Sequence, residues 1–138
     1  MSVTMFLVIT VFVWGLAPIF DKVAVEGTSP FIGNIYRSLT IAAIMIAIAV
    51  FSGEIKVVFR MPVKNILFYV GSGALAGGIG VVTYYKAMQL APSSKVVPIA
   101  AAYPLVTAVL SMLFLGEKIS FERFAGIILI ITGIYLVK

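Results

Sequence analysis

The chain has 138 residues, of which 62% are hydrophobic and only 11% are charged, and its mean hydropathy is +1.19. A soluble domain carries roughly a quarter charged residues, so the composition excludes an ordinary aqueous protein and indicates a membrane protein. The net charge is +5, but the ten Lys and Arg residues form no basic run, which argues against a nucleic-acid partner.

The chain contains no Cys and no His. Their absence from the sequence excludes disulfides, thiol nucleophiles, imidazole bases and most transition-metal sites. A membrane-embedded hydrolase needs acids or a nucleophile with its base inside the bilayer, whereas we expect all the carboxylates in or beside connecting loops. We therefore expect no enzymatic activity, no metal and no cofactor. The carboxylates are Asp21, Glu26, Glu54, Glu117 and Glu122.

The first apolar segment begins near the start of the chain. Residues 1–20 contain no charged side chain, and a spanning helix needs about 20 predominantly apolar residues, so we predict a first span over about 3–21. A tryptophan at the end of a span is usually an interface anchor. Trp14 lies nearer the middle, so its indole is a candidate for stacking on a planar or cationic substrate.

Capping signals place the second and third spans. Ser29-Pro30 combines a helix N-cap with a proline at the first helical position and predicts a span over about 30–51. Pro62 opens a third helix over about 62–90, which at 1.5 Å per residue is roughly 40 Å long. Because this exceeds the hydrocarbon core, we expect the helix to tilt, to kink at its glycines or to begin outside the bilayer.

Arg37 is the most costly residue of the second span. It lies about seven residues, or roughly 10 Å, inside the helix, and a central Arg costs at least about 2.5–3.5 kcal/mol on insertion scales. We expect it to snorkel to the interface, to pair with Asp21, or to face a wet cavity beside Asn34 and Ser38. A cavity role would favour anionic or carboxylate-bearing substrates, so Asn34 and Arg37 are candidate substrate-binding residues.

Small residues recur through the third span at a spacing of four. Gly73 and Gly77 share one helix face, and Gly80 belongs to a neighbouring row. Such rows let another backbone approach closely, so they predict helix packing. They also predict a smooth, bendable wall for a substrate cavity, and both can hold at once. Tyr84 is a further cavity candidate near the end of the span, although Lys86 beside the tyrosine pair is expected in the interfacial belt.

Capping residues also place the last two spans. The serines of the tight connection at 91–94 are positioned to cap a fourth span over about 95–115, and Gly116 ends it. Ser120 caps a fifth span over about 121–137.

Two prolines and a polar stripe mark the fourth span. Pro98 and Pro104 each remove a backbone hydrogen bond and are expected to bend the helix. Tyr103, Thr107 and Ser111 are spaced by four and therefore share one face. These polar groups are expected either to bond to adjacent helices or to face the cavity and contact substrate.

Five spans without a long loop predict a single all-α, polytopic membrane domain over 1–138 whose termini lie on opposite sides. The ten basic residues then divide five against five, so the excess that normally sets orientation is missing. Either another feature fixes the orientation of a monomer or hetero-oligomer, or copies insert both ways and pair about a two-fold axis in the membrane plane. The two groups are Lys56, Arg60, Lys64, Lys118 and Arg123, and Lys22, Arg37, Lys86, Lys95 and Lys138.

A series of motifs resembles the EamA-type domain of the drug/metabolite transporter superfamily. The resemblance covers almost the whole chain, and its most specific part runs from residue 84 to residue 133. The matching segments are Trp14-Gly15, Arg37, YYKAMQLAPSS at 84–94, Val97-Pro98-Ile99, Tyr103-Pro104-Leu105, LGEKIS at 115–120, and the Gly126 and Gly133 pair.

The resemblance implies half of a ten-helix transporter built from two inverted halves. Such a protein moves small organic metabolites or drugs by alternating access across the prokaryotic plasma membrane, with its first four helices lining the cavity and the fifth at the periphery. An inverted homodimer would supply the second half, as in the related small multidrug resistance proteins. Those relatives use a glutamate in the first helix for proton coupling; here no carboxylate precedes Asp21, so that mechanism does not carry over.

The alternative is a non-transporting structural or regulatory subunit that pairs with another half-sized protein. In both cases the expected partners are the lipid bilayer and a second subunit, and transport adds a small-molecule substrate. Flux through liposomes that contain only this chain separates the two.

Overall fold

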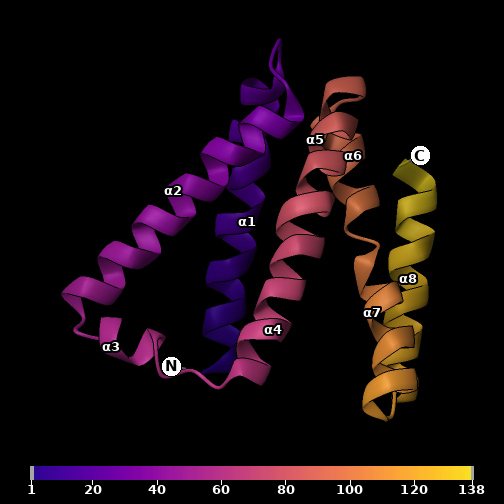
Figure 1. Ribbon diagram of the computed structural model, residues 1–138. Coiled ribbons are helices and arrows are strands. Elements are labelled where there is room, and N and C mark those ends of the chain that lie inside the picture. Colours follow the sequence, from indigo (N-terminus) through magenta and orange to yellow (C-terminus); the bar gives the residue numbers. More distant parts are fainter. Residues whose placement is uncertain (1, 138) are drawn as a thin grey trace. The chain divides into compact units, whose positions relative to one another are not determined.

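The computed structural model describes residues 2–137, and Lys138, counted above with one group of charges, lies outside them. All regular secondary structure in the described range is helical (Figure 1). The chain divides into two compact units: one holds residues 2–18 and 90–137, and the other holds Ile19–Gln89. The organisation as a single domain over 1–138 stays a prediction.

Four helical stretches are long and apolar enough to cross a membrane. They match the first four predicted spans: α1 Val3–Val25, α2 Pro30–Phe51, the stretch Val63–Leu90, and the stretch Ser93–Leu115. The protein is therefore an all-helical, polytopic membrane protein. The predicted fifth span corresponds to α8, Phe121–Val137, whose 17 residues make it shorter than the other four; its passage through the bilayer stays a prediction.

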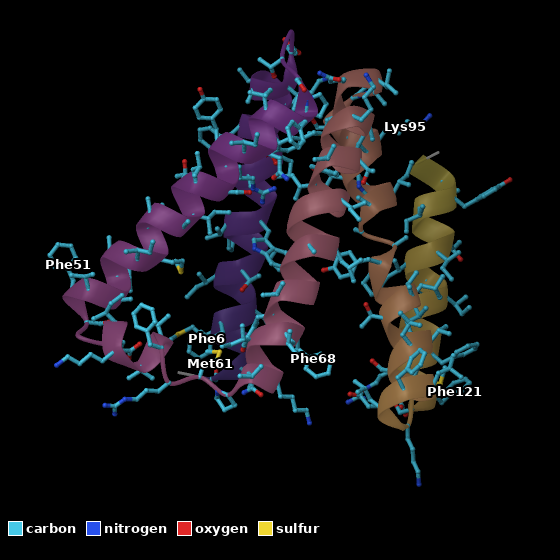
Figure 2. The ribbon with its side chains drawn as sticks, in the orientation of Figure 1. Phe6, Phe51, Met61, Phe68, Lys95 and Phe121 are labelled. Atoms are coloured by element: carbon cyan, nitrogen blue, oxygen red, sulfur yellow. The ribbon has the colours of Figure 1, made fainter. Side chains whose placement is uncertain are left out.

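Most of the large apolar side chains are exposed on the surface of the structure. Figure 2 shows Phe51, Phe68 and Phe121 pointing away from their own helices, and all three are exposed. Among the described residues, the buried hydrophobic side chains are Val25, Tyr85, Met88 and Val96. This pattern is that of helices solvated by lipid, because lipid tails are as apolar as the side chains and do not drive them into a core.

The end of α1 departs from the sequence expectation. The helix continues to Val25, so Asp21 lies inside its last turns, whereas we expected it in or beside a loop. Ser29 is the N-cap of α2 and Pro30 opens the helix as predicted, although the serine side chain makes no capping hydrogen bond. Helix α1 continues to Val25 because no Gly or Pro interrupts it after Ile19.

The unit Ile19–Gln89 contains the last turns of α1, all of α2, and the long third span. After α2 comes a single short turn, α3 (Ile55–Val58), and then α4 (Val63–Ser72), the π-helical segment η1 (Gly73–Gly80) and α5 (Val81–Leu90). Figure 1 shows α4 and α5 as parts of one continuous helical rod. The first turns of α2 lie near α5, and α2 then diverges from α4 toward α3.

The glycines predicted to bend the third span adopt a π-helix. A Cβ on Gly80 would lie 3.0 Å from the Leu75 carbonyl oxygen, a tight contact that favours glycine at position 80. A Cβ on Gly73 or Gly77 would meet open space. The close helix packing expected at Gly73 and Gly77 stays a prediction, although Asn34 of α2 reaches the Gly77 carbonyl oxygen.

The other unit contains the fourth predicted span, which is interrupted. It consists of α6 (Ser93–Ala100), α7 (Tyr103–Leu110) and the π-helical η2 (Ser111–Leu115). Pro98 lies inside α6 as expected. Pro104 lies in the first turn of α7 and not in a helix interior, because the helix ends after Ala100 and restarts where proline is tolerated.

The turn into α8 follows the capping residues. Gly116 has φ of +66°, a left-handed conformation that ends η2. The Ser120 hydroxyl accepts a hydrogen bond from the Arg123 backbone N–H at 3.4 Å and caps α8 as predicted. In contrast, α6 begins at Ser93, two residues before the predicted start, and its N-cap is Pro92, which has no side-chain capping bond.

Candidate functional site

An apolar groove runs between α2 and the η1–α5 part of the third span. We call it the α2–η1 groove; its volume is about 690 Å³. Ten residues line it and none of them is charged: Phe31, Asn34, Ile35, Ser38 and Leu39 on one side, and Ala74, Gly78, Ile79, Val82 and Thr83 on the other. The volume lies within the range of small-molecule sites, which are mostly apolar with a few placed polar groups.

Asn34 holds the two walls of the α2–η1 groove together. Its side chain is 9% exposed, and its Nδ2 donates to the Gly77 carbonyl oxygen at 2.8 Å and lies 3.5 Å from that of Gly78. A helix that changes to π-type bonding alters which carbonyls its own ladder can satisfy. An unpaired carbonyl is costly in a bilayer, so the Asn34 amide stabilises the π-helical wall.

A second polar cluster joins α1, α2 and α5. Tyr85 is 4% exposed, and its hydroxyl donates to the Asp21 carboxylate at 2.7 Å. Its ring packs against α2 at Gly33, where an added Cβ would lie in ordinary van der Waals contact with the ring at 3.6 Å. The neighbouring Tyr84 ring is tilted, with its centroid 6.3 Å from that of Tyr85. The half-buried Arg37 lies close enough for its charge to act on both tyrosines.

Two further side chains, those of Lys22 and Gln89, connect the end of α1 with the end of α5. The Lys22 amine donates to the Met88 carbonyl oxygen at 2.7 Å, in the last turn of α5 where positive charge is favoured. The Gln89 amide donates to the carbonyl oxygens of Val25 at 2.8 Å and Thr28 at 2.7 Å. Three helix ends are therefore connected through side chains where Met88 is fully buried.

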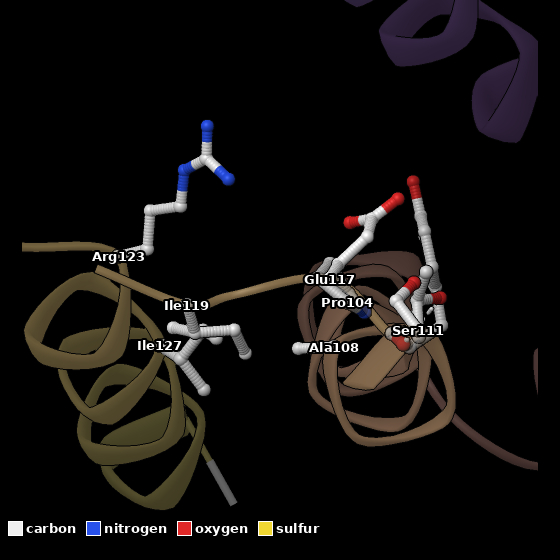
Figure 3. Close-up of a pocket in the computed structure, with 9 residues that line it drawn as sticks. Pro104, Ala108, Ser111, Glu117, Ile119, Arg123 and Ile127 are labelled. Carbon is white, nitrogen blue, oxygen red and sulfur yellow. Dashed lines mark hydrogen bonds between the residues drawn. The ribbon is translucent and has the colours of Figure 1, made fainter. Parts of the chain in front are cut away.

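The polar stripe of the fourth span lies along a smaller pocket between α7 and α8 (Figure 3). The pocket has a volume of about 250 Å³, and Tyr103, Thr107 and Ser111 are among the residues that line it. Thr107 also donates to the Tyr103 carbonyl within the helix, at 3.1 Å. Glu117 and Arg123 extend from the two sides of the pocket, so this site carries both charges.

The predicted site residues thus separate into groups. Asn34 lines the α2–η1 groove, and Arg37 and Tyr84 belong to the tyrosine cluster in the same unit. Arg37 therefore neighbours the Asp21–Tyr85 pair and does not line the groove with Asn34 and Ser38. The stripe at 103, 107 and 111 belongs to the other unit. Trp14 is exposed on α1 and is not among the residues that line the groove or the pocket.

Sequence reasoning missed the positions of Tyr85 and Gln89. We predicted an interfacial position for Lys86, which is exposed, and gave no role to Tyr85, which is buried. A signal was available, since Tyr85 and Gln89 are four residues apart and share a helix face that is otherwise apolar. Their partners lie more than 60 residues away, which the local pattern does not specify.

Comparisons with known proteins give a consistent result. The EamA-like transporter family model matches residues 1–138. An uncharacterized transporter of Sinorhizobium sp., from the cobO 3' region, is 28% identical over 88% of this chain and 85% of its own length. An uncharacterized protein of Methanocaldococcus jannaschii is 37% identical over 54% of this chain and 55% of its own.

A longer relative matches this chain over less than half of its length. An uncharacterized transporter of Archaeoglobus fulgidus is 25% identical over 90% of this chain but only 44% of its own length. The chain thus covers most of the Sinorhizobium relative and less than half of the Archaeoglobus transporter. No solved structure matches the chain.

Proposed function

Because the chain belongs to the EamA-like transporter family, we propose that it transports small organic molecules across the prokaryotic plasma membrane. The observation that carries this proposal is the family match over residues 1–138. That range contains four helical stretches able to cross a bilayer. The candidate residues for substrate contact are Trp14, Asn34, Arg37, Tyr84, Tyr103, Thr107 and Ser111.

We further propose that the working form is an inverted homodimer. The chain corresponds to less than half of the Archaeoglobus transporter, so a second copy would supply the remainder. The five-against-five division of basic residues gives no preference for one orientation. In such a pair, the halves would rock against each other and expose a midplane cavity to each side in turn.

A second candidate function is that of a non-transporting subunit. The coverage of the Archaeoglobus transporter favours it equally, since the missing half could come from a different half-sized protein. This alternative also requires no substrate site within the chain itself.

Counterflow in liposomes that contain only this chain separates the two functions. We expect saturable, solute-specific uptake from a panel of radiolabelled amino acids, amines, nucleosides and aromatic metabolites, because two copies would complete the cavity. Protein-free liposomes give the background. Uptake that appears only after a second half-sized protein is added would instead support the subunit.

The absence of cysteine allows a direct test of orientation. Glu54→Cys and Ser94→Cys each introduce one thiol at an exposed position, and the predicted spans place the two on opposite sides. If copies insert both ways, a membrane-impermeant maleimide added to intact cells labels about half of each variant. Complete labelling of one variant with none of the other would rule out the inverted homodimer. Permeabilised cells provide the total for both.

A further inference from the structure

We infer that the α2–η1 groove binds an uncharged, largely apolar molecule that donates a hydrogen bond to Asn34. The inference rests on the proposed transport function, since it specifies the class of substrate. It differs from the expectation drawn from the sequence, in which a cavity containing Arg37 would favour anions.

Charge is the first reason. None of the ten described residues that line the groove is charged. Arg37, the only charged side chain of α2, lies instead near Tyr84 and Tyr85, where the Asp21 carboxylate already provides a negative charge. An anion in the groove would lose its hydration without gaining a counter-charge, which strongly disfavours it.

The orientation of the Asn34 amide is the second reason. Its Nδ2 donates to the Gly77 carbonyl, whereas the reversed amide would bring two oxygens together. The Nδ2 group faces the carbonyl oxygens of both Gly77 and Gly78, at 2.8 and 3.5 Å, so the amide oxygen is the group that Asn34 offers to a ligand. An oxygen acceptor selects a ligand with an N–H or O–H donor. Thr83 already donates its hydroxyl to the Ile79 and Gly80 carbonyl oxygens, at 3.0 and 2.9 Å.

The size and walls of the groove are the third reason. Its volume of about 690 Å³ accommodates a small aromatic or aliphatic molecule, whereas the α7–α8 pocket is smaller at about 250 Å³ and carries Glu117 and Arg123. Phe31, Ile35 and Ile79 provide apolar contact. On the η1 side, Ala74 has a small side chain and Gly78 has none, so the ligand can lie against the π-helical backbone there.

A matched pair of substitutions in η1 tests the site. Ala74 lines the groove and Ala76, in the same π-helix, does not. Ala74→Leu is expected to weaken saturable binding of indole at least about tenfold, because the larger side chain occupies the groove. Ala76→Leu is expected to leave it within about twofold. The measurement is equilibrium dialysis of radiolabelled indole against the purified protein in lipid nanodiscs, with empty nanodiscs giving the partition into lipid.

Two analogues test the chemistry. 1-Methylindole lacks the N–H donor and is expected to bind about fivefold more weakly, the worth of one hydrogen bond. Indole-3-acetate retains the donor but adds a charge, and it is expected to bind more weakly still. Tightest binding of the anion, lost on Arg37→Ala, would overturn the inference in favour of an anion site at Arg37. Indole binding that Ala74→Leu does not change would overturn it in favour of a lipid chain or a helix of a second copy in the groove.

These outcomes are separate from those of the transport test. Specific indole binding without counterflow in liposomes that contain only this chain would support the groove and contradict transport by this chain alone. Counterflow of anions without indole binding would support transport and contradict the uncharged substrate class.

Discussion

Replacing Tyr85 by alanine is expected to destabilise the protein by about 3–5 kcal/mol, the usual cost of removing a buried aromatic ring. The ring is 4% exposed and packs against Gly33, and its hydroxyl binds Asp21 at 2.7 Å. The substitution therefore creates a cavity and removes a partner from a carboxylate. Unfolding in mixed micelles with increasing SDS measures the change.

Two variants separate the contributions of Tyr85. Tyr85→Phe keeps the ring and removes the hydroxyl, so we expect a loss of about 1–3 kcal/mol from the Asp21 partner alone. Tyr69→Ala removes a tyrosine that is 70% exposed in the same span and should cost much less. If Tyr85→Ala were no more damaging than Tyr69→Ala, the burial of Tyr85 between α1, α2 and α5 would be contradicted.

The charges of Asp21 and Arg37 are expected to be energetically coupled. Both act on the tyrosine pair from different helices. Asp21→Asn and Arg37→Gln each remove one of the two opposite charges beside the tyrosine pair, and each is expected to cost about 1–3 kcal/mol. This is less than the loss for a fully buried pair, because both residues are only half-buried. The double variant removes both charges and should cost less than the sum of the single changes.

The exposed pair Glu54 and Arg60 provides the control for this cycle. Glu54→Gln and Arg60→Gln are expected to change stability by no more than about 0.5 kcal/mol each and to add without coupling. Additive behaviour of Asp21→Asn and Arg37→Gln would show that the two charges act independently. The same SDS unfolding measurement serves this cycle and its control.

The sequence predicts what depends on local chemistry. Hydropathy located four spans, and the positions of Ser29-Pro30, Gly116 and Ser120 located helix ends, because each acts through backbone groups within a few residues. Pro104 was assigned to a helix interior, since the preceding break at 101–102 has no separate signal in the sequence.

Contacts between distant residues were beyond such reasoning. The bond from Asn34 to the Gly77 carbonyl joins residues 43 apart, and that from Tyr85 to Asp21 joins residues 64 apart. Both depend on how the helices pack. The glycine run predicted a bendable segment, but it did not indicate the π-helical form or the bond that Asn34 of α2 donates to it. Arg37 had three expected environments, and only packing distinguishes among them.

The π-helical segment also constrains the length of the chain. Each residue of an α-helix turns the chain by about 100°, and each residue of the wider π-helix turns it by less. A single deletion between Gly73 and Gly80 would therefore still rotate everything that follows about the helix axis. Tyr85 and Gln89 would then leave the side that faces Asp21 and Val25. The phase of α5 relative to α4 is thus fixed by residue number as well as residue type. At positions with open space such as Gly73 and Gly77, a substitution by another small residue preserves the register that a change in length destroys.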